Sequence, residues 1–384
     1  MLKAYKFRLY PNKITANKLQ WVLDRCRELY NAALQERKEA YTYARKSMSY
    51  VEQSRSLTEI KAEDRREYQE IGSHVLQNAL KRVDLAFQAF FRRIKAGETP
   101  GYPRFQGRNR YDSFCYPDHA GWKLDNKTLH LTKIGDLKVK LHRPVEGKMK
   151  TCTIKREGEH WYVIFACEVE AEKLPLSSED VGIDLGVTHF AALSDGTFIG
   201  NPRHYRQAEK KLQRLQQALA RKKCGSHRRQ KAVKQVARAH RKVRNQRKEF
   251  LHKESRKLVN RYQVIVFEDI QTANLVKRPK PKQDETGTYL PNGAAAKGGL
   301  NKSITDAGWA QLVQYVSYKA ASAGRTVLTV NPKYTSQLCS SCGQVRKKEL
   351  SERWHSCDCG AELDRDHNAA INILRLGQSR QACV

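Results

Sequence analysis

The chain has 384 residues and a formal net charge of +32 at pH 7, which favours a polyanionic partner, nucleic acid ahead of an anionic membrane surface or of solubility alone. This length allows two or three domains with hydrophobic cores, and six of the ten cysteines lie isolated along the sequence, which excludes a disulfide scaffold. No apolar run is longer than a strand and Met1–Tyr10 has no signal-peptide core, so we expect a cytoplasmic protein that does not bind a membrane.

Residues 1–96 predict one strand followed by helices. Lys3–Leu9 alternates apolar and polar residues as a strand does. Two later stripes repeat at helical spacing, and we interpret both as packing faces rather than as ligand sites. The first runs from Leu19 to Tyr30, and the second consists of Val75, Leu76, Ala79, Leu80, Val83, Phe87, Phe90 and Phe91. We expect residues 1–10 to form the first strand of a β domain and residues 11–96 to form a helical region.

Residues 97–175 carry Gly, Pro and aromatic residues between alternating segments, such as Leu137–Leu141 and Trp161–Ala166, which predicts a mostly β domain. Basic and aromatic residues share its turns, a mixture suited to phosphate contact and base stacking, although a solvated surface would explain it equally well. These residues are Arg104, Arg108, Arg110, Lys123 and Lys127 together with Tyr102, Phe105, Tyr111, Phe114 and Tyr116.

A third region, residues 180–335, opens with a predicted meander of three antiparallel strands that turns at Asp195–Gly196. Residues 204–260 then predict one or two long helices with a turn at Gly225–Ser226. They hold twenty lysines and arginines but few acids around a thin apolar seam. A charged helix face is often simply solvated, but the scarcity of acids here favours contact with phosphates.

The remaining elements follow in order. Val264–Phe267 is apolar at consecutive positions, as a strand buried on both faces is. Lys277–Gly299 is rich in Pro, Gly and Ala, and we expect either a mobile segment over the surface or a lid beside the site. Ile304–Ala323 predicts one amphipathic helix and Thr326–Val330 another strand, and the last predicted helix is Asn368–Leu376.

Two acidic residues stand at the ends of predicted strands. Asp184, in the sequence Gly-Ile-Asp-Leu-Gly, lies on the strand face opposite its apolar neighbours, although a lone Asp there is more often a turn or cap residue. Glu268 ends the buried strand, where an ionised carboxylate is rare without a partner or a metal.

Asp366 begins the last helix, where a carboxylate is ordinarily an N-cap. The order of elements favours another role. The elements form a ribonuclease-H-like arrangement, in which the three acids meet. Its order is three meander strands, a helical insertion, a buried strand that ends in Glu, a helix, a strand and a last helix that begins with Asp. We expect Asp184, Glu268 and Asp366 to be the catalytic metal ligands, with Asp364 and Asp269 as reserve candidates.

Three clustered carboxylates repel one another, and hard cations such as Mg²⁺ or Mn²⁺ relieve that repulsion. We expect two such ions about 4 Å apart, which would support in-line hydrolysis of a phosphodiester. The sequence therefore predicts a basic, metal-dependent nuclease without a small-molecule substrate.

Residues 336–362 have the spacing of a structural zinc site. Cys339, Cys342, Cys357 and Cys359 would bind Zn²⁺ tetrahedrally and order short loops that have no core of their own. The second pair is one residue tighter than usual, which leaves His355 as a substitute ligand. Residues 363–384 would form the final helix and tail.

Several motifs together make the chain resemble the TnpB (OrfB) family of proteins encoded by insertion sequences, relatives of type V CRISPR effectors, over nearly its whole length. They are Lys6–Pro11, Gly101–Phe105, Gly182–Gly186, Phe267–Asp269, Ile304–Trp309, Tyr334–Gln337 and Asp364–Ala370.

The resemblance implies an α/β multidomain protein: a RuvC-like nuclease domain with an inserted zinc ribbon, and an N-terminal wedge-like β domain containing a helical recognition insertion. It implies a guide RNA derived from the transposon end, a short target-adjacent motif, and cleavage of double-stranded DNA at one site. The family's carboxylates correspond to Asp184, Glu268 and Asp366. Two other interpretations remain, a strand-transfer transposase and a zinc-ribbon nucleic-acid-binding regulator without nuclease activity.

Overall fold

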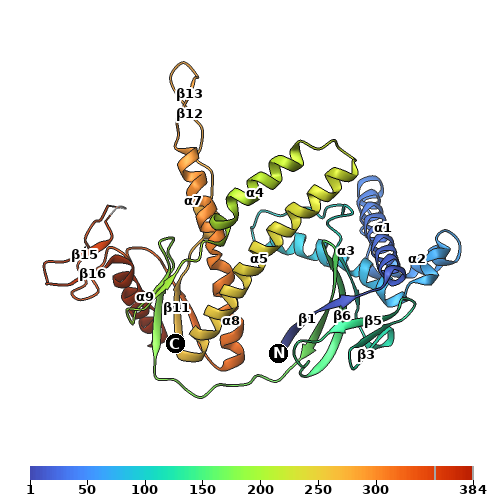
Figure 1. Ribbon diagram of the computed structural model, residues 1–384, viewed down its shortest axis with the longest axis horizontal. Coiled ribbons are helices and arrows are strands. Elements are labelled where there is room, and N and C mark those ends of the chain that lie inside the picture. The colour runs from blue at the N-terminus through green and yellow to red at the C-terminus, as the bar shows by residue number, and fades with distance from the viewer. Residues whose placement is uncertain (350–351, 383–384) are drawn as a thin grey trace. The chain divides into compact units, whose positions relative to one another are not determined.

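The computed structural model describes residues 1–349 and 352–382. The chain divides into two compact units, Met1–Glu170 and Ala171–Val384, each with its own sheet (Figure 1). No helix in the described part of the chain is both long and apolar enough to cross a membrane.

The first unit is built on a seven-stranded antiparallel sheet with the order β2-β6-β7-β1-β5-β4-β3. β1 pairs with β5 and β7, which follow it only after the helices, so the helical segment is inserted between the first strand and the rest of one sheet. The strands are β1 (Leu2–Tyr10), β2 (Ser113–Tyr116), β3 (Trp122–Asp125), β4 (Thr128–Leu131), β5 (Gly135–Lys140), β6 (Lys148–Glu157) and β7 (His160–Glu168).

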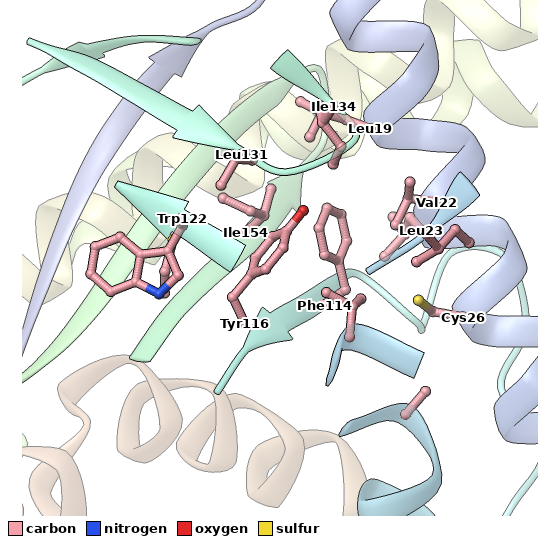
Figure 2. Packing of buried hydrophobic residues seen from close by; sticks show 14 of the residues in the cluster. Leu19, Val22, Leu23, Cys26, Phe114, Tyr116, Trp122, Leu131, Ile134 and Ile154 are labelled. Carbon is pink, nitrogen blue, oxygen red and sulfur yellow. The ribbon is translucent and has the colours of Figure 1, made fainter. Parts of the chain in front are cut away.

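Three helices lie between β1 and β2 in the sequence: α1 (Lys13–Ala44), α2 (Tyr50–Ala62) and α3 (Ser73–Lys95). Asn12 caps α1 by accepting from the backbone N–H of Thr15, and Ser49 with Glu52 forms a capping box on α2. Buried residues of α1, among them Leu19 and Leu23, belong to one core with strand residues such as Phe114 (Figure 2). The predicted helices and strands of this half are confirmed at the level of elements.

Two expectations about aromatic residues in this unit are wrong. Tyr111, Phe114 and Tyr116 are buried in the core, so they are not available to stack on bases, whereas Tyr102 and Phe105 are exposed. Conversely, the α3 stripe is not all core, because the exposed fraction of Phe91 is 59%.

The second unit contains a five-stranded sheet with the order β10-β9-β8-β11-β14. The first three strands form the predicted antiparallel meander, and β11 lies between β8 and β14, parallel to both. The strands are β8 (Asp180–Asp184), β9 (His189–Leu193), β10 (Phe198–Gly200), β11 (Val264–Glu268) and β14 (Thr326–Val330).

Helices cover both faces of this sheet. Side chains of α5 (His227–Arg261) and α8 (Trp309–Ala323) form one core with Val181, Ile183 and Phe267. On the other face, α9 (Arg365–Ala382) packs through Ile373 against Val264 and Val266. Because successive strand residues face opposite sides, even-numbered positions of β8 and β11 face α9.

The other elements match the sequence with three differences. α4 (His204–Ala220) and α5 form the expected basic helix pair. The predicted helix over Ile304–Ala323 is two helices, α7 (Ala294–Ala307) and α8, because Gly308 adopts a left-handed φ of 72° between them. The Pro/Gly-rich segment contains a small hairpin, β12 (Lys282–Gln283) with β13 (Tyr289–Leu290), and α9 begins at Arg365 rather than at Asn368.

Candidate functional site

Neighbouring parallel strands bring Asp184 and Glu268 to one edge of the sheet. β8 and β11 pair with Gly182 beside Val266 and Ile183 beside Phe267, and one further step along this register sets Asp184 beside Glu268. Both carboxylates occupy positions that face α9 and stand at the carboxyl ends of their strands.

Glycines allow α9 to approach the same edge. A Cβ atom on Gly182 would lie 2.2 Å from the carbonyl oxygen of Ala370, so α9 could not pack this closely against any other residue there. A Cβ atom on Gly377 would lie 2.5 Å from the side chain of Val266. Because α9 packs this closely, a carboxylate oxygen of Asp366, in the first turn of the helix, lies 3.7 Å from where a Cβ atom on Gly186 would be. Gly186 follows Asp184 by two residues.

The pKa of Asp184 reflects the nearness of the other two carboxylates. Burial raises the pKa of Asp184 well above its ordinary value, and repulsion from Glu268 and from Asp366 adds to this, while Arg365 opposes it. Burial also raises the pKa of Glu268. The ionised cluster is therefore unfavourable on its own and is relieved by either a proton or a cation.

The structure separates the roles of Asp364 and Asp366. One oxygen of Asp364 accepts from the backbone N–H groups of Asp366, at 2.8 Å, and of His367, at 3.2 Å, so Asp364 is the N-cap of α9. Asp366 is the second residue of α9, and its carboxylate lies 3.4 Å from the guanidinium of Arg365. Asp269 is exposed and accepts from the side chain of Gln271, and it does not join the three carboxylates.

Sequence reasoning missed the residues that support this edge. The hydroxyl of Thr335, which is buried, donates to Glu268 at 2.5 Å and lowers the pKa of that carboxyl, against the larger effect of burial. The side chain of Asn372 on α9 donates to the carbonyl of Thr335 at 3.0 Å. No periodicity marks Thr335, and only its place in the Tyr334–Gln337 motif singled out the segment.

The four cysteines Cys339, Cys342, Cys357 and Cys359 form a cluster whose sulfur atoms all lie within 4.8 Å of one another. In residues 1–349 and 352–382, no other group of three or more His, Cys, Asp or Glu residues has its ligand atoms this close to one another. Four sulfurs at this spacing fit tetrahedral Zn²⁺. The tight spacing between Cys357 and Cys359 does not prevent both from joining the cluster.

Each cysteine pair is followed by a glycine that the turn requires. Gly343 has φ of 78° and Gly360 has φ of 83°, and their N–H groups donate to the carbonyls of Cys339 and Cys357. Two short strands, β15 (Trp354–Ser356) and β16 (Glu362–Asp364), complete this ribbon.

The surroundings shift the pKa values of Cys339 and Cys359 in opposite directions. Burial raises the pKa of Cys339, but hydrogen bonds from the backbone N–H groups of Cys342 and Ser341 and from the side chains of His355 and Cys357 together lower it to about 5. A backbone N–H lowers the pKa of Cys359, but its three cysteine neighbours raise it to about 12. Bound Zn²⁺ would favour the ionised form of all four thiols, since it takes thiolates as ligands.

His355 lies outside the four-sulfur cluster. Its ring is buried on β15, and its Nδ1 contacts the ammonium of Lys348. The geometry therefore favours four cysteine ligands over substitution by His355.

The basic helices present the expected charged surface. Of the seam residues, Leu212 and Val243 are buried but Val233 is exposed. A hollow of about 710 Å³ between α5 and α7 is lined by His240, Arg247, Arg278, Lys297 and Lys302, among others. Cations in a concave surface suit a phosphate backbone.

Three segments match models of known protein families. Residues 164–278 match OrfB_IS605, described as a probable transposase, and residues 309–373 match the Cas12f1-like TNB domain. Residues 1–46 match a helix-turn-helix domain of the same OrfB group, although in this chain they form β1 and α1.

Two bacterial proteins are similar over almost the full length. The chain is 34% identical to a Streptomyces pristinaespiralis protein named "Putative RNA-guided DNA endonuclease", covering 99% of this chain and 90% of that protein. It is 33% identical to the Escherichia coli K12 protein "Putative RNA-guided DNA endonuclease InsQ", and the similarity covers 100% of this chain and 94% of that protein.

Among solved structures, the Cas12f1 chain of a Cas12f1-sgRNA-target DNA complex aligns with 97% of this chain and 98% of its own, with a TM-score of 0.59 and 13% identity. At that identity the likeness concerns the fold alone.

Proposed function

Because this chain belongs to the OrfB (TnpB) family, with relatives named as RNA-guided DNA endonucleases, we propose that it is itself a transposon-associated, RNA-guided DNA endonuclease. It would bind a guide RNA derived from the transposon end, recognise a short target-adjacent motif in double-stranded DNA and hydrolyse phosphodiesters at one site. The observation that carries the proposal is the convergence of Asp184, Glu268 and Asp366 at one edge of the sheet.

The second unit supports a RuvC-like assignment. An antiparallel meander followed by two parallel strands, in the order β10-β9-β8-β11-β14, is the strand arrangement expected of a ribonuclease-H fold. We assign residues 180–335 and 363–384 to this nuclease domain, with the basic insertion 204–260 and the zinc ribbon 336–362. Residues 1–10 and 97–175 would form the wedge-like domain, whose compact part ends at Glu170, and residues 11–96 the helical recognition insertion.

Three side chains would hold Mg²⁺ or Mn²⁺. Asp184 is close enough to both other carboxylates for their charges to raise its pKa, so it suits a bridging ligand, with Glu268 and Asp366 completing the set. All three offer the hard oxygen atoms that these cations prefer. Ions held by these residues would supply activation of a water molecule and neutralisation of charge on the leaving 3′ oxygen.

The chain's own residues would position these ligands. Thr335 orients Glu268, Arg365 partly neutralises Asp366, and the first turn of α9 places its dipole behind that carboxylate. The Cys₄ ribbon would hold Zn²⁺ with a structural role, since four protein ligands leave no open position.

The proposal is tested by expressing the protein with its flanking element end, purifying it and sequencing the RNA that accompanies it. RNA from one element end and Mg²⁺-dependent cutting of guide-matched plasmid, lost after RNase treatment, are expected. Asp184→Ala should abolish cutting, and the neighbouring exposed Asp269→Ala should retain it. Joining of donor ends without RNA would instead indicate a strand-transfer transposase, and unaltered activity of Asp184→Ala would indicate a regulator.

A further inference from the structure

Four aromatic rings gather at the end of α3, and we call Phe87, Phe90, Phe91 and Tyr102 the α3 aromatic surface. Tyr102 contacts Phe87 and Phe90 edge-on, with ring centroids 5.7 and 5.4 Å apart, and Phe91 lies 5.2 Å from Phe90. The exposed fractions are 59% for Phe91 and 46% for Tyr102. Contiguous exposed apolar side chains mark an interaction surface more often than isolated ones do.

This surface is formed before any partner binds. The side chain of Asn31 on α1 both donates to the carbonyl of Gln106 and accepts from its N–H, which ties the segment carrying Tyr102 to the helices. The guanidinium of Arg37 lies 5.5 Å from the ring centroid of Phe87. These contacts hold Tyr102 and Phe87 in place, and Phe91 packs against Phe87 and Phe90, so less conformational entropy is lost when a flat ligand stacks on the rings.

The surroundings are strongly basic. Arg92, Arg93 and Lys95 follow Phe91 on the exposed end of the helix, and Arg104 is exposed two residues after Tyr102. Exposed aromatic rings among arginines are the composition of surfaces that bind single-stranded nucleic acid, in which bases stack and phosphates meet cations.

We propose that unpaired bases of the guide RNA stack on the α3 aromatic surface, an inference that rests on the proposed function for the identity of that RNA. The basic rim and the net charge of +32 favour a polyanion over an apolar protein face or a second copy of the chain. RNA is favoured over DNA because the target enters as a duplex with stacked bases, whereas a folded RNA presents unpaired loops.

The test uses the full-length protein and a short single-stranded RNA that contains 2-aminopurine, whose fluorescence falls when it stacks. Phe91→Ala should weaken binding about tenfold and reduce the fluorescence quenching, as loss of one stacked base does. Phe91→Trp should retain both. The slope of log affinity against log salt should stay unchanged, since no phosphate contact is removed. Tyr43→Ala, at a tyrosine that is 85% exposed on α1, is the matched control and should bind normally.

A blunt-ended RNA duplex and a single-stranded DNA of the same sequence complete the experiment. The duplex should bind both proteins equally, and the co-purified guide RNA should be lost more readily from Phe91→Ala than from the wild type. Unchanged RNA binding by Phe91→Ala, an equal loss for the duplex, or a loss for the DNA alone would overturn the proposal. So would a large drop in melting temperature or a loss of self-association, which would mean that the ring packs against protein.

These outcomes are separable from those of the proposed function. Stacking is measured without cleavage, so an inactive protein that still shows the Phe91 effect would refute only the endonuclease. A guide-dependent nuclease whose RNA affinity is indifferent to Phe91 would refute only the stacking surface.

Discussion

At the scale of single residues, the hydroxyl of Thr335 is the group that orients Glu268. Thr335→Val keeps the shape of the side chain but leaves that carboxylate without its donor. We expect cleavage at limiting Mg²⁺ to fall about 10–100-fold, the usual effect of losing such a supporting hydrogen bond. Because the bond lowers the pKa of Glu268, its loss should also move the acidic limb of the pH–rate profile to higher pH.

Thr335→Ser is the control, since it keeps the hydroxyl and should restore both the Mg²⁺ dependence and the pH profile. Equal defects in the Val and Ser variants would show that only packing at this position matters. RNA binding should be the same in all three proteins.

Asp184 should make the metal-free protein less stable as pH rises. Its folded pKa is raised, so the stability it contributes is present below its unfolded pKa and is lost as pH increases through the folded value. At neutral pH in EDTA, Asp184→Asn should raise the free energy of unfolding, because the neutral amide neither carries a buried charge nor repels Glu268 and Asp366. The gain should disappear near pH 4.

Thermal melts with and without Mg²⁺ check this prediction. The divalent ion should stabilise the wild type and not Asp184→Asn. A variant that is less stable than the wild type at neutral pH, or a gain that persists in acid, would contradict the picture of repelling carboxylates. Asp269→Asn, at an exposed position, should behave as the wild type does.

At the scale of elements, the seating of α9 on the sheet depends on Gly182. A methyl group there would meet the backbone of Ala370 and Leu374, neither of which can rotate away. Gly182→Ala should therefore cost about 1–3 kcal/mol of stability and displace Asp366, with loss of cleavage. Differential scanning calorimetry and a cleavage assay measure the two effects.

Gly298→Ala is the matched control, because nothing lies within 4 Å of a Cβ atom at that position in α7. It should be neutral or slightly stabilising, since Ala is the better helix former. A Gly182→Ala protein with wild-type stability would show that α9 does not pack as described.

The zinc ribbon should lose order as a separate element. Cys359→Ser removes one sulfur of the cluster, so bound zinc measured by elemental analysis should fall sharply and the ribbon should become sensitive to protease before the rest. Cys224→Ser, at an exposed cysteine outside the cluster, should change neither. Undiminished zinc in Cys359→Ser would refute the four-cysteine site.

Some elements were predictable because their signals are local. The meander, the apolar β11, the basic helix pair and the cysteine spacing all follow from patterns within a few residues. The break at Gly308 was missed because a glycine inside a helical pattern is compatible with either a continuous or an interrupted helix.

Other features depend on contacts between distant segments. Whether Tyr116 is buried or Phe91 exposed is decided by which surfaces the strands and helices cover, and no period in the sequence reports that. The support of Glu268 by Thr335 likewise joins residues far apart in the chain. Asp184 and Glu268 could be named from sequence because they end apolar strands. The division between Asp364 as the cap of α9 and Asp366 as the carboxylate paired with Arg365 needed the geometry of the helix.

At the scale of the whole molecule, the net charge of +32 should make RNA binding strongly dependent on salt. Each phosphate that meets a lysine or arginine releases condensed counterions, so log affinity should fall linearly and steeply with log salt concentration. Charge-removing changes in α5, such as Arg244→Gln with Lys248→Gln, should make that slope shallower. Filter-binding titrations measure it, and a flat dependence would exclude extensive phosphate contact.

The central claim is that side chains of β8, β11 and α9 form one cage for divalent cations. Anomalous diffraction from crystals of the RNA-bound protein soaked in Mn²⁺ tests it most directly. We expect two manganese peaks about 4 Å apart, within coordination distance of Asp184, Glu268 and Asp366. Manganese bound elsewhere, with these three carboxylates free of metal, would contradict the account.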